Sequence, residues 1–370
     1  MSYRSLPVTL LRGGTSKGLF FRMDALPTDT PARERLLLRA LGSPDPYGKQ
    51  IDGLGTGIST TSKAVLIGPS SQPDCDIDYL FGHVSITDAL VDWSGNCGNL
   101  SAAVPLFALQ QGMVAGVAAD GPVSVRIWQA NIGKRIIAEL HMQHGEPVWW
   151  GDYRIDGVAF PGAPIRLRFL DPAGGASGRL FPSGQACDLL TLPDGQQLAA
   201  TLIDAGNPTV FVRAADFGLD GEERGDELDA DTLQRLEWAR CAGAVRMGLG
   251  SDPRQISRER PATPKISFLS PTRSADCALT ARILSMGRLH HAYTGTGAIA
   301  LAAAAAIDGT LVAELCGGSW RDKPLCFAHA SGSQTLSTVL SGEDGRWHIA
   351  EVVMTRTARP LLSGTLYVPD

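Results

Sequence analysis

Residues 97–103 read CGNLSAA and open an apolar run that ends at Gly112, while residues 294–298 read TGTGA and open a similar run that ends at Gly309. From the first residue of the motif to the closing glycine, the interval is fifteen residues in both copies. Each copy predicts a helix of small residues that begins at a glycine-containing turn and ends at a glycine. The first N–H groups of such helices attract anions. One copy begins with a thiol and the other with a hydroxyl. We expect the reactive residues of the site to lie where the two copies differ in this way.

A second pair of motifs supports a duplication of the chain. Residues 12–15 (RGGT) precede the apolar run 19–21, and residues 206–209 (GNPT) precede the apolar run 210–212. Both read as a tight turn that leads into a strand. The threonine of this turn precedes the helix motif by 82 residues in the first half and by 85 in the second. Self-similarity over so long a period predicts two halves of similar structure.

The pattern of elements predicts an α+β fold of two similar lobes. Strand-like segments outnumber helical ones, and a helix does not follow every strand, which argues against a doubly wound sheet. Glycine- and proline-rich stretches at 171–184 and 192–195 place the crossover near residue 195. We therefore expect a first domain over 1–195, completed by a terminal strand at 357–370, and a second domain over 196–356.

Composition narrows the class of protein. A chain of 370 residues with 44% hydrophobic and 19% charged residues suits an enzyme with about two packed domains. The net charge of −5 and the lack of a basic cluster argue against nucleic acid as a partner. No uncharged run of 18 apolar residues and no secretory leader is present, so we expect no membrane association. Seven cysteines without paired spacing predict reduced thiols in a cytoplasmic protein.

Cys97 is the first candidate for chemistry. It lies in an open polar turn with glycines at 95 and 98 and asparagines at 96 and 99. A thiol at the start of a helix forms its thiolate more readily than a thiol in an apolar core. A buried structural thiol is the alternative. The sequence around Cys97 favours a catalytic role, whereas the other six cysteines read as structural.

Lys63 is the second candidate. It ends the hydroxyl-rich segment 59–63 (STTSK), and a strand of buried character begins at Ala64. A lysine at that junction can be desolvated enough to exchange protons, although a surface lysine is the ordinary alternative. Lys17 in RGGTSKG lacks the spacing of a phosphate-binding loop. It reads as a cation for a carboxylate or as a turn lysine.

Metal binding is not expected. His141 and His144 form an HxxH pattern without the following glutamate of a zinc protease, and no CxxC occurs. His290 and His291 precede the second glycine turn, where they line a pocket or flank the helix at the surface.

Several motifs together resemble one enzyme family over nearly the whole chain. The motifs are RGGTSKG (12–18), SPDPYGKQIDG (43–53), STTSK (59–63), IDYLF (77–81), VDWSGNCGNLSAAV (91–104), RIWQANIGK (126–134) and SMGRLHHA (285–292). They are similar to those of the 2-methylaconitate cis–trans isomerase (PrpF) family, and VDWSGNCGN with RIWQANIGK is the most specific part. That family resembles diaminopimelate epimerase, which has two related domains, each a curved sheet around a central helix, with the active site between them.

The resemblance also implies a reaction. The epimerases use one cysteine from each half, but this chain has Cys97 in the first position and Thr294 in the second. Inversion at an amino-acid α-carbon is therefore not expected. The resemblance implies that Cys97 and Lys63 exchange protons with a tricarboxylate, converting 2-methyl-trans-aconitate to the cis isomer without metal or cofactor.

A tricarboxylate needs cationic, hydroxyl or N–H partners. Those expected from the first half are Thr15, Ser16, Lys17, Ser59, Thr60, Asn96, Gly98 and Asn99. Those expected from the second half are His290, Thr294, Gly295 and Thr296, to which the resemblance adds Lys265 and Ser285.

Related activities remain open alternatives. Similar enzymes are a 4-oxalomesaconate tautomerase and a methylitaconate isomerase, and both would use the same cysteine. A non-catalytic accessory to an iron–sulfur methylcitrate dehydratase is a different class, against which the presence of both Cys97 and Lys63 argues. A functional pairing with such a dehydratase and an isologous homodimer are expectations about partners.

Overall fold

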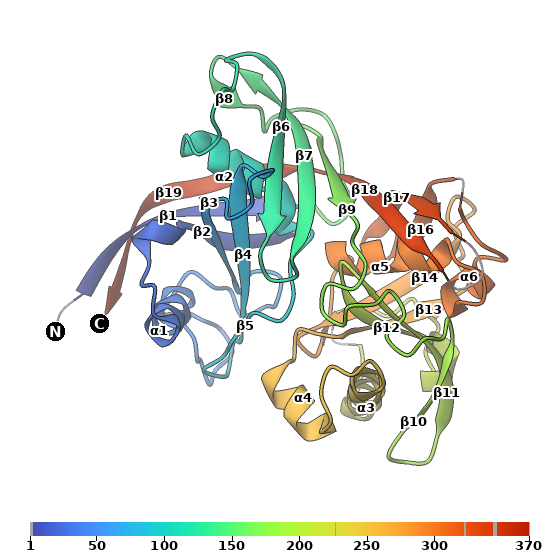
Figure 1. Cartoon of the computed structure of the whole chain (residues 1–370). Coiled ribbons are helices and arrows are strands. Elements are labelled where there is room, and N and C mark those ends of the chain that lie inside the picture. The colour runs from blue at the N-terminus through green and yellow to red at the C-terminus, as the bar shows by residue number, and fades with distance from the viewer. Residues whose placement is uncertain (1–2, 226, 322, 343–345, 370) are drawn as a thin grey trace. The chain divides into compact units, whose positions relative to one another are not determined.

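The chain forms two compact units. The computed structural model describes residues 3–225, 227–321, 323–342 and 346–369. Unit 1 comprises Met1–Leu167 and Thr355–Asp370, and unit 2 comprises Arg168–Met354. The chain passes between the units within strands β9 (Ile165–Leu170) and β18 (His348–Arg356), both labelled in Figure 1.

The first crossover lies earlier than the sequence predicts. Unit 1 ends at Leu167 rather than at residue 195, and it resumes at Thr355 rather than at 357. The glycine- and proline-rich segment after β9 belongs to unit 2, because the Gly174 N–H donates to the carbonyl of Asp204 at 2.8 Å. Flexible composition marked this segment as a linker, but backbone hydrogen bonds attach it to the second unit.

The sheet of unit 1 begins with the hairpin that RGGTSKG predicts. Strands β1 and β2 pair antiparallel, β2 and β3 parallel, β3 and β4 antiparallel, β4 and β6 parallel, and β6 and β7 antiparallel. The C-terminal strand β19 pairs antiparallel with β1. The strands are β1 (Tyr3–Gly13), β2 (Ser16–Arg22), β3 (Lys63–Pro69), β4 (Ile77–Val84), β5 (Val91–Asp92), β6 (Gly121–Gln129), β7 (Lys134–Gln143), β8 (Glu146–Pro147) and β19 (Ala358–Pro369).

Helix α1 (Thr30–Leu41) covers part of this sheet and follows ordinary capping rules. The Asp29 side chain accepts the N–H of Ala32 at the start, and Gly42, with φ of +78°, ends the helix. The leucines of its inner face, among them Leu37, are buried in one core with the strands.

The helical segment after Cys97 is interrupted, unlike the single helix that the sequence predicts. A 3₁₀ turn η2 (Leu100–Ala102) precedes the seven-residue helix α2 (Val104–Gln110). Pro105 has no N–H with which to continue the hydrogen-bond ladder from the preceding turn, so a new helix starts there. The segment is buried, and the ring of Phe107 in α2 lies 5.7 Å from that of Phe20 in β2.

Unit 2 repeats the pairing series of unit 1. Strands β11 to β14 and β16 to β17 pair antiparallel, parallel, antiparallel, parallel and antiparallel, in the same order as β1 to β4 and β6 to β7. Its strands are β10 (Asp188–Thr191), β11 (Gln197–Ala205), β12 (Asn207–Arg213), β13 (Lys265–Ser270), β14 (Leu279–Ser285), β15 (Arg288–Leu289), β16 (Leu325–His329), β17 (Gly332–Ser341) and β18. This topology confirms the predicted α+β class with two similar lobes.

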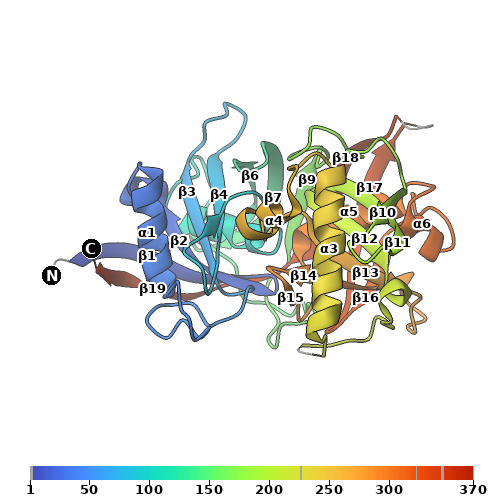
Figure 2. The ribbon, with the colours of Figure 1, turned by 90° about the horizontal axis from the view of Figure 1, so that it is seen from below.

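The helices occupy matching places in the two series. Helix α3 lies between β12 and β13 in the chain, as α1 lies between β2 and β3, and it packs on strands of its sheet (Figure 2). Every residue of α5 is buried, and α5 follows β15 as η2 and α2 follow β5. The helices are α3 (Ala230–Arg246), α4 (Pro253–Glu259), α5 (Gly295–Ala305) and α6 (Leu311–Leu315), with 3₁₀ turns η1 (Met23–Ala25) and η3 (Ala214–Phe217). Among the described residues, no helix is long and apolar enough to cross a membrane.

Candidate active site

Lys63 and Cys97 lie side by side in unit 1. Lys63 Nζ donates a hydrogen bond to Cys97 Sγ at 3.5 Å and another to Ser16 Oγ at 3.0 Å. The parallel pairing of β2 with β3 explains the second contact, because its register places Lys63 beside Gly18, two residues along β2 from Ser16. Lys63 is 4% exposed and Cys97 is 7% exposed. The structure thus brings the two predicted catalytic residues into direct contact.

The surroundings of the Lys63 ammonium are unusual for a buried cation. Among the residues that the structure describes, the ammonium contacts the Cys97 thiol and the Ser16 hydroxyl, and the centroid of the Phe81 ring lies 5.9 Å away. Within the described part of the chain, no carboxylate forms an ion pair with Lys63. Burying an ammonium is unfavourable unless negative charge or strong acceptors face it. A thiolate at Cys97 or a carboxylate of a bound ligand would supply that charge.

The Cys97 turn is held by hydrogen bonds from three directions. Cys97 Sγ accepts a hydrogen bond from the Leu100 N–H at 3.5 Å. The backbone carbonyl of Cys97 accepts one from the Ser101 N–H at 3.0 Å. The Tyr79 hydroxyl donates to the same carbonyl at 3.3 Å. Burial raises the pKa of Tyr79 well above its ordinary value, so this donor keeps its proton. The turn is therefore fixed with its sulfur facing two donors, Lys63 and an N–H group.

A second network joins the Cys97 turn to the β1–β2 hairpin. Asn99 Nδ2 donates to Thr15 Oγ1 at 3.0 Å, and Asn99 Oδ1 accepts from Arg356 Nε at 3.2 Å. A Cβ at Gly14, where φ is +51°, would lie 2.5 Å from Asn99 Oδ1, so only glycine fits there. Burial lowers the pKa of Arg356 to about 10, which leaves the side chain cationic at neutral pH. Arg356 therefore places a buried positive charge next to the side-chain oxygen of Asn99.

Sequence reasoning missed Arg356 and Tyr79 as parts of this site. Arg356 lies 257 residues from Asn99 and has no local motif of its own. Tyr79 had a weak signal, because its position in the alternating strand 77–81 predicts an inward side chain. The hydrogen bonds of Arg356 with Asn99 and of Tyr79 with Cys97 become visible only in the folded structure.

The other predicted residues of unit 1 gather at the same strand ends. The Lys17 N–H donates to the Thr60 carbonyl at 3.0 Å, and Ser59 O contacts His83 Nε2 at 3.0 Å. Ser59 and Thr60 are buried and Lys17 is half-buried. Asn96 and Gly98, on either side of Cys97, are buried as well. The predicted contacts of the first half therefore form one neighbourhood.

Unit 2 contains the counterpart of this turn without a thiol. Thr294 Oγ1 accepts from the Gly297 N–H at 3.1 Å and caps α5, whose first residue is Gly295. This bond spans three residues, as does the bond from Leu100 to Cys97. Asn207 Nδ2 donates to Thr296 Oγ1 at 3.1 Å, again joining a hairpin to a helix turn. The two turns are thus built alike.

The remaining predicted residues lie at the strand ends of unit 2. Lys265 begins β13 as Lys63 begins β3, and its Nζ donates to the Ala262 carbonyl at 3.2 Å. Ser285 ends β14, and His290 follows β15 with its Nδ1 accepting from the Ala292 N–H at 3.0 Å. All three predicted side chains are buried.

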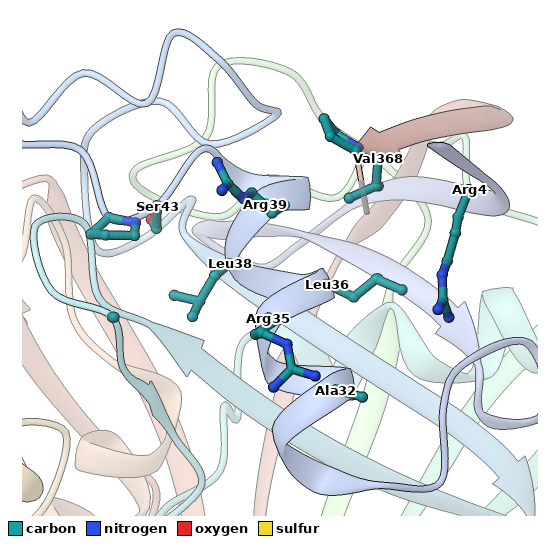
Figure 3. A pocket seen from close by; sticks show the side chains of 11 residues that line it. Arg4, Ala32, Arg35, Leu36, Leu38, Arg39, Ser43 and Val368 are labelled. Carbon is teal, nitrogen blue, oxygen red and sulfur yellow. The ribbon is translucent and has the colours of Figure 1, made fainter. Parts of the chain in front are cut away.

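A pocket of about 560 Å³ in unit 1 lies elsewhere and contains none of the predicted site residues (Figure 3). It is lined by Arg4, Ala32, Arg35, Leu36, Leu38, Arg39, Ser43, Pro44, Ala89, Val368 and Pro369. The thiol and ammonium that could transfer a proton are absent from it, so we locate the candidate chemistry at Cys97 rather than here.

Comparison with known proteins agrees with the motifs and the geometry. The family model described as PrpF protein matches residues 3–369. The chain belongs to the PrpF family. It is 46% identical to a 2-methyl-aconitate isomerase of Cupriavidus necator, over 98% of this chain and 97% of the relative. It is 45% identical to a 2-methyl-aconitate isomerase of Shewanella oneidensis, over 98% of this chain and 96% of the relative.

Solved structures similar to this PrpF chain agree on the fold. A methylitaconate-delta-isomerase superposes with a TM-score of 0.74 at 36% identity, covering 100% of this chain and 96% of that one. A hydroxyproline epimerase of Agrobacterium vitis superposes with a TM-score of 0.58 at 14% identity, covering 99% of this chain and 92% of that one. The fold is the diaminopimelate epimerase-like fold that the motifs predict, and the chain is an isomerase.

Ser16 gives a first testable prediction, because it positions Lys63. Ser16→Ala removes the hydroxyl 3.0 Å from Lys63 Nζ, and we expect kcat to fall by about 10-fold with little change in KM. Steady-state kinetics and the pH dependence of kcat measure the effect, and Ser16→Thr should restore most of the rate. An unchanged pH profile with a lowered melting temperature would instead indicate a purely structural role.

Proposed function

We propose that this PrpF protein converts 2-methyl-trans-aconitate to 2-methyl-cis-aconitate by moving one proton off and back onto the substrate. The contact between Cys97 and Lys63 is the observation that supports this reaction best, since it places a thiol and an ammonium within 3.5 Å in a buried turn. The identity of 46% and 45% to two 2-methyl-aconitate isomerases supports the choice of substrate.

The chemistry requires only proton transfer. The CH₂ group of the substrate lies next to a carboxylate and to the double bond, and both acidify its hydrogens. Removal of one hydrogen gives a delocalised dienolate in which the former double bond has single-bond character. Rotation about that bond, followed by return of a proton to the same carbon, gives the cis isomer. One group that accepts a proton and one that donates it are sufficient.

Cys97 and Lys63 together provide those two groups. A sulfur that accepts from Lys63 Nζ and from the Leu100 N–H can hold a negative charge between turnovers. One member of the pair must be without its proton to take one from the substrate, and the other, which has its proton, can then give one back. Transfer of a single proton across the 3.5 Å contact would restore the starting state of the pair. Ser16 and Tyr79 hold the lysine and the cysteine turn in place.

Carboxylates of the substrate need partners near this pair. We assign Lys17 and the hydroxyls of Ser59 and Thr60 to this task in unit 1, since they gather at the strand ends beside Lys63. The cationic Arg356 contributes positive charge through Asn99. An anion that forms during the reaction would be stabilised by this cationic environment.

A shift of the double bond within methylitaconate is the second candidate, which the similarity to the methylitaconate-delta-isomerase supports. Its chemistry would likewise remove an allylic proton, but would return a proton to the other end of the allylic system, and it would use the same Cys97. The 4-oxalomesaconate tautomerisation also belongs to this class. All three reactions leave the mass of the substrate unchanged.

A substrate panel tests the proposal. The purified protein is incubated separately with 2-methyl-trans-aconitate, methylitaconate and 4-oxalomesaconate, and product formation is followed by proton NMR. We expect kcat/KM for 2-methyl-trans-aconitate to exceed that for the other two by about 10-fold or more. A higher value for methylitaconate would replace the first candidate by the second, and no turnover of any of the three would contradict the isomerase proposal.

The proposed reaction has a place in propionate breakdown through the methylcitrate cycle. There an iron–sulfur methylcitrate dehydratase would form the unsaturated tricarboxylate by removing water from methylcitrate, and we propose such a dehydratase as the functional partner of this enzyme.

A further inference from the structure

Unit 2 contains a pair of thiols that the proposed reaction does not use. Cys277 Sγ and Cys326 Sγ lie 2.9 Å apart, and one of the two S–H groups donates to the other sulfur. The two residues are 49 positions apart in the sequence. The fold, not local sequence, therefore brings these sulfurs together.

Neighbouring strands fix the geometry of the pair. Cys277 lies two residues before β14, and Cys326 is the second residue of β16, which pairs parallel with β14 through Leu279 and Phe327. The Ala278 N–H also donates to the Cys326 carbonyl at 2.8 Å. In this register Ala278 lies opposite Cys326, so Cys277 is one position away from the residue that faces Cys326. The sulfurs nevertheless lie only 2.9 Å apart, not far beyond the length of about 2.05 Å of an S–S bond. Small side-chain rotations would suffice to join the sulfurs.

The pair can be reached from solvent. Both cysteines are half-buried, and residues 273–276 immediately before Cys277 are all exposed. Burial raises the pKa of Cys277 to about 11, and the hydrogen bond with Cys326 acts in the same direction. Cys277 therefore keeps its proton near neutral pH, and either thiol can be the donor of the hydrogen bond between the two sulfurs. Because burial suppresses its thiolate, Cys277 is expected to be slow to attack an oxidant first.

We propose that Cys277 and Cys326 form a reversible intramolecular disulfide, a modification site in unit 2. With a small-molecule disulfide such as oxidised glutathione as oxidant, the Cys326 sulfur attacks it, loses its proton and releases one glutathione thiol. The Cys277 sulfur then attacks the Cys326 sulfur of this mixed disulfide, loses its proton and releases the second glutathione thiol. Two protein thiols are oxidised and one glutathione disulfide is reduced to two thiols.

The bond would close a loop that contains the second helix turn. Residues between the two cysteines include β14, Thr294 and the whole of α5. A cross-link across such a segment restricts the unfolded chain and so stabilises the folded unit. The oxidised protein should therefore resist heating more than the reduced protein does.

Peptide mapping of the purified full-length protein tests the proposal. The reduced protein is equilibrated with oxidised glutathione, quenched in acid, alkylated and digested with trypsin. We expect the peptide 274–282, which contains Cys277, to be joined to 322–346, which contains Cys326, with the pair two hydrogens lighter than the separate peptides. Dithiothreitol should separate them, and the oxidised form should melt roughly 5 °C or more higher than the reduced form.

Three variants make the result specific. Cys187→Ser removes an exposed thiol and should leave the cross-link unchanged. Cys277→Ser should trap one glutathionyl group on Cys326, whereas Cys326→Ser should abolish the cross-link and leave Cys277 slow to react. Absence of the joined peptides after Cys187 of the wild-type protein has become fully glutathionylated would overturn the proposal. A joined pair with any other cysteine would overturn it as well.

Discussion

Replacement of Cys97 by serine is expected to lower kcat and kcat/KM for 2-methyl-trans-aconitate together, by about 10²–10⁴-fold. The serine hydroxyl fits the turn and can still accept the Lys63 and Leu100 N–H groups that contact the sulfur. A hydroxyl gives up its proton far less readily than a thiol, so proton transfer should fail while binding persists. Steady-state kinetics and substrate binding by calorimetry separate the two effects.

Cys75→Ser is the matched control for this experiment. Cys75 is also a buried thiol of unit 1, but it lies outside the Lys63 neighbourhood, and we expect its replacement to leave kcat unchanged. Comparable melting temperatures for the two variants would show that the loss at Cys97 is chemical. Full activity of Cys97→Ser would refute the role of the thiol.

Replacement of Lys63 by methionine is expected to lower kcat/KM by about 10²-fold or more. Methionine retains much of the buried length of lysine but removes the ammonium that contacts Cys97 Sγ and Ser16 Oγ. Both the shared proton and the positive charge beside a substrate carboxylate would be lost. We therefore expect kcat to fall and KM to rise, in contrast to Cys97→Ser, where KM changes little.

Two lysines provide the comparison for Lys63→Met. Lys49→Met changes an exposed lysine of unit 1 and should leave both constants unchanged. Lys17→Met should mainly raise KM, because we assign Lys17 to substrate binding alone. A Lys63→Met variant whose kcat equals that of the wild type would show that the lysine acts only in binding.

The two duplicated turns differ in the chemistry that their residues can perform. The hairpin, the parallel strand and the capped helix turn occur in both units, and both parallel strands begin with a buried lysine, Lys63 or Lys265. In unit 1 the lysine reaches the sulfur of Cys97, whereas in unit 2 its Nζ donates to a backbone carbonyl. The Thr294 hydroxyl at the second position caps α5 by accepting the Gly297 N–H, but a hydroxyl is a poor acid or base near neutral pH.

The sequence predicted those parts of the fold that depend on local rules. The RGGTSKG hairpin, the capped helix α1 and the repeated helix turns follow from glycines, prolines and caps whose effects reach only a few residues. The duplicated spacing then predicted two lobes, and the pairing series of the strands confirms them. The contact of Lys63 with Cys97 also agrees with the predicted pair of site residues.

Other features depend on contacts between distant residues and could not be predicted. The break before α2 is an exception, because Pro105 is a local signal for a helix start, but the small-residue pattern around it favoured one continuous helix. The end of unit 1 at Leu167 depends on hydrogen bonds between the segment near Gly174 and β11, which composition does not encode. Arg356 joins the site only because β18 ends beside the Asn99 turn.

Proton NMR of the reaction in D₂O tests the central claim most directly. The wild-type protein is mixed with 2-methyl-trans-aconitate, and both the cis isomer and the allylic CH₂ signal are followed over many turnovers. Because the Lys63 ammonium and the Cys97 thiol have hydrogens that exchange with solvent, we predict that deuterium replaces the CH₂ hydrogens as the cis isomer accumulates. Cys97→Ser should show neither isomer nor exchange. Accumulation of the cis isomer at the wild-type rate in Cys97→Ser would contradict transfer of a proton by this pair.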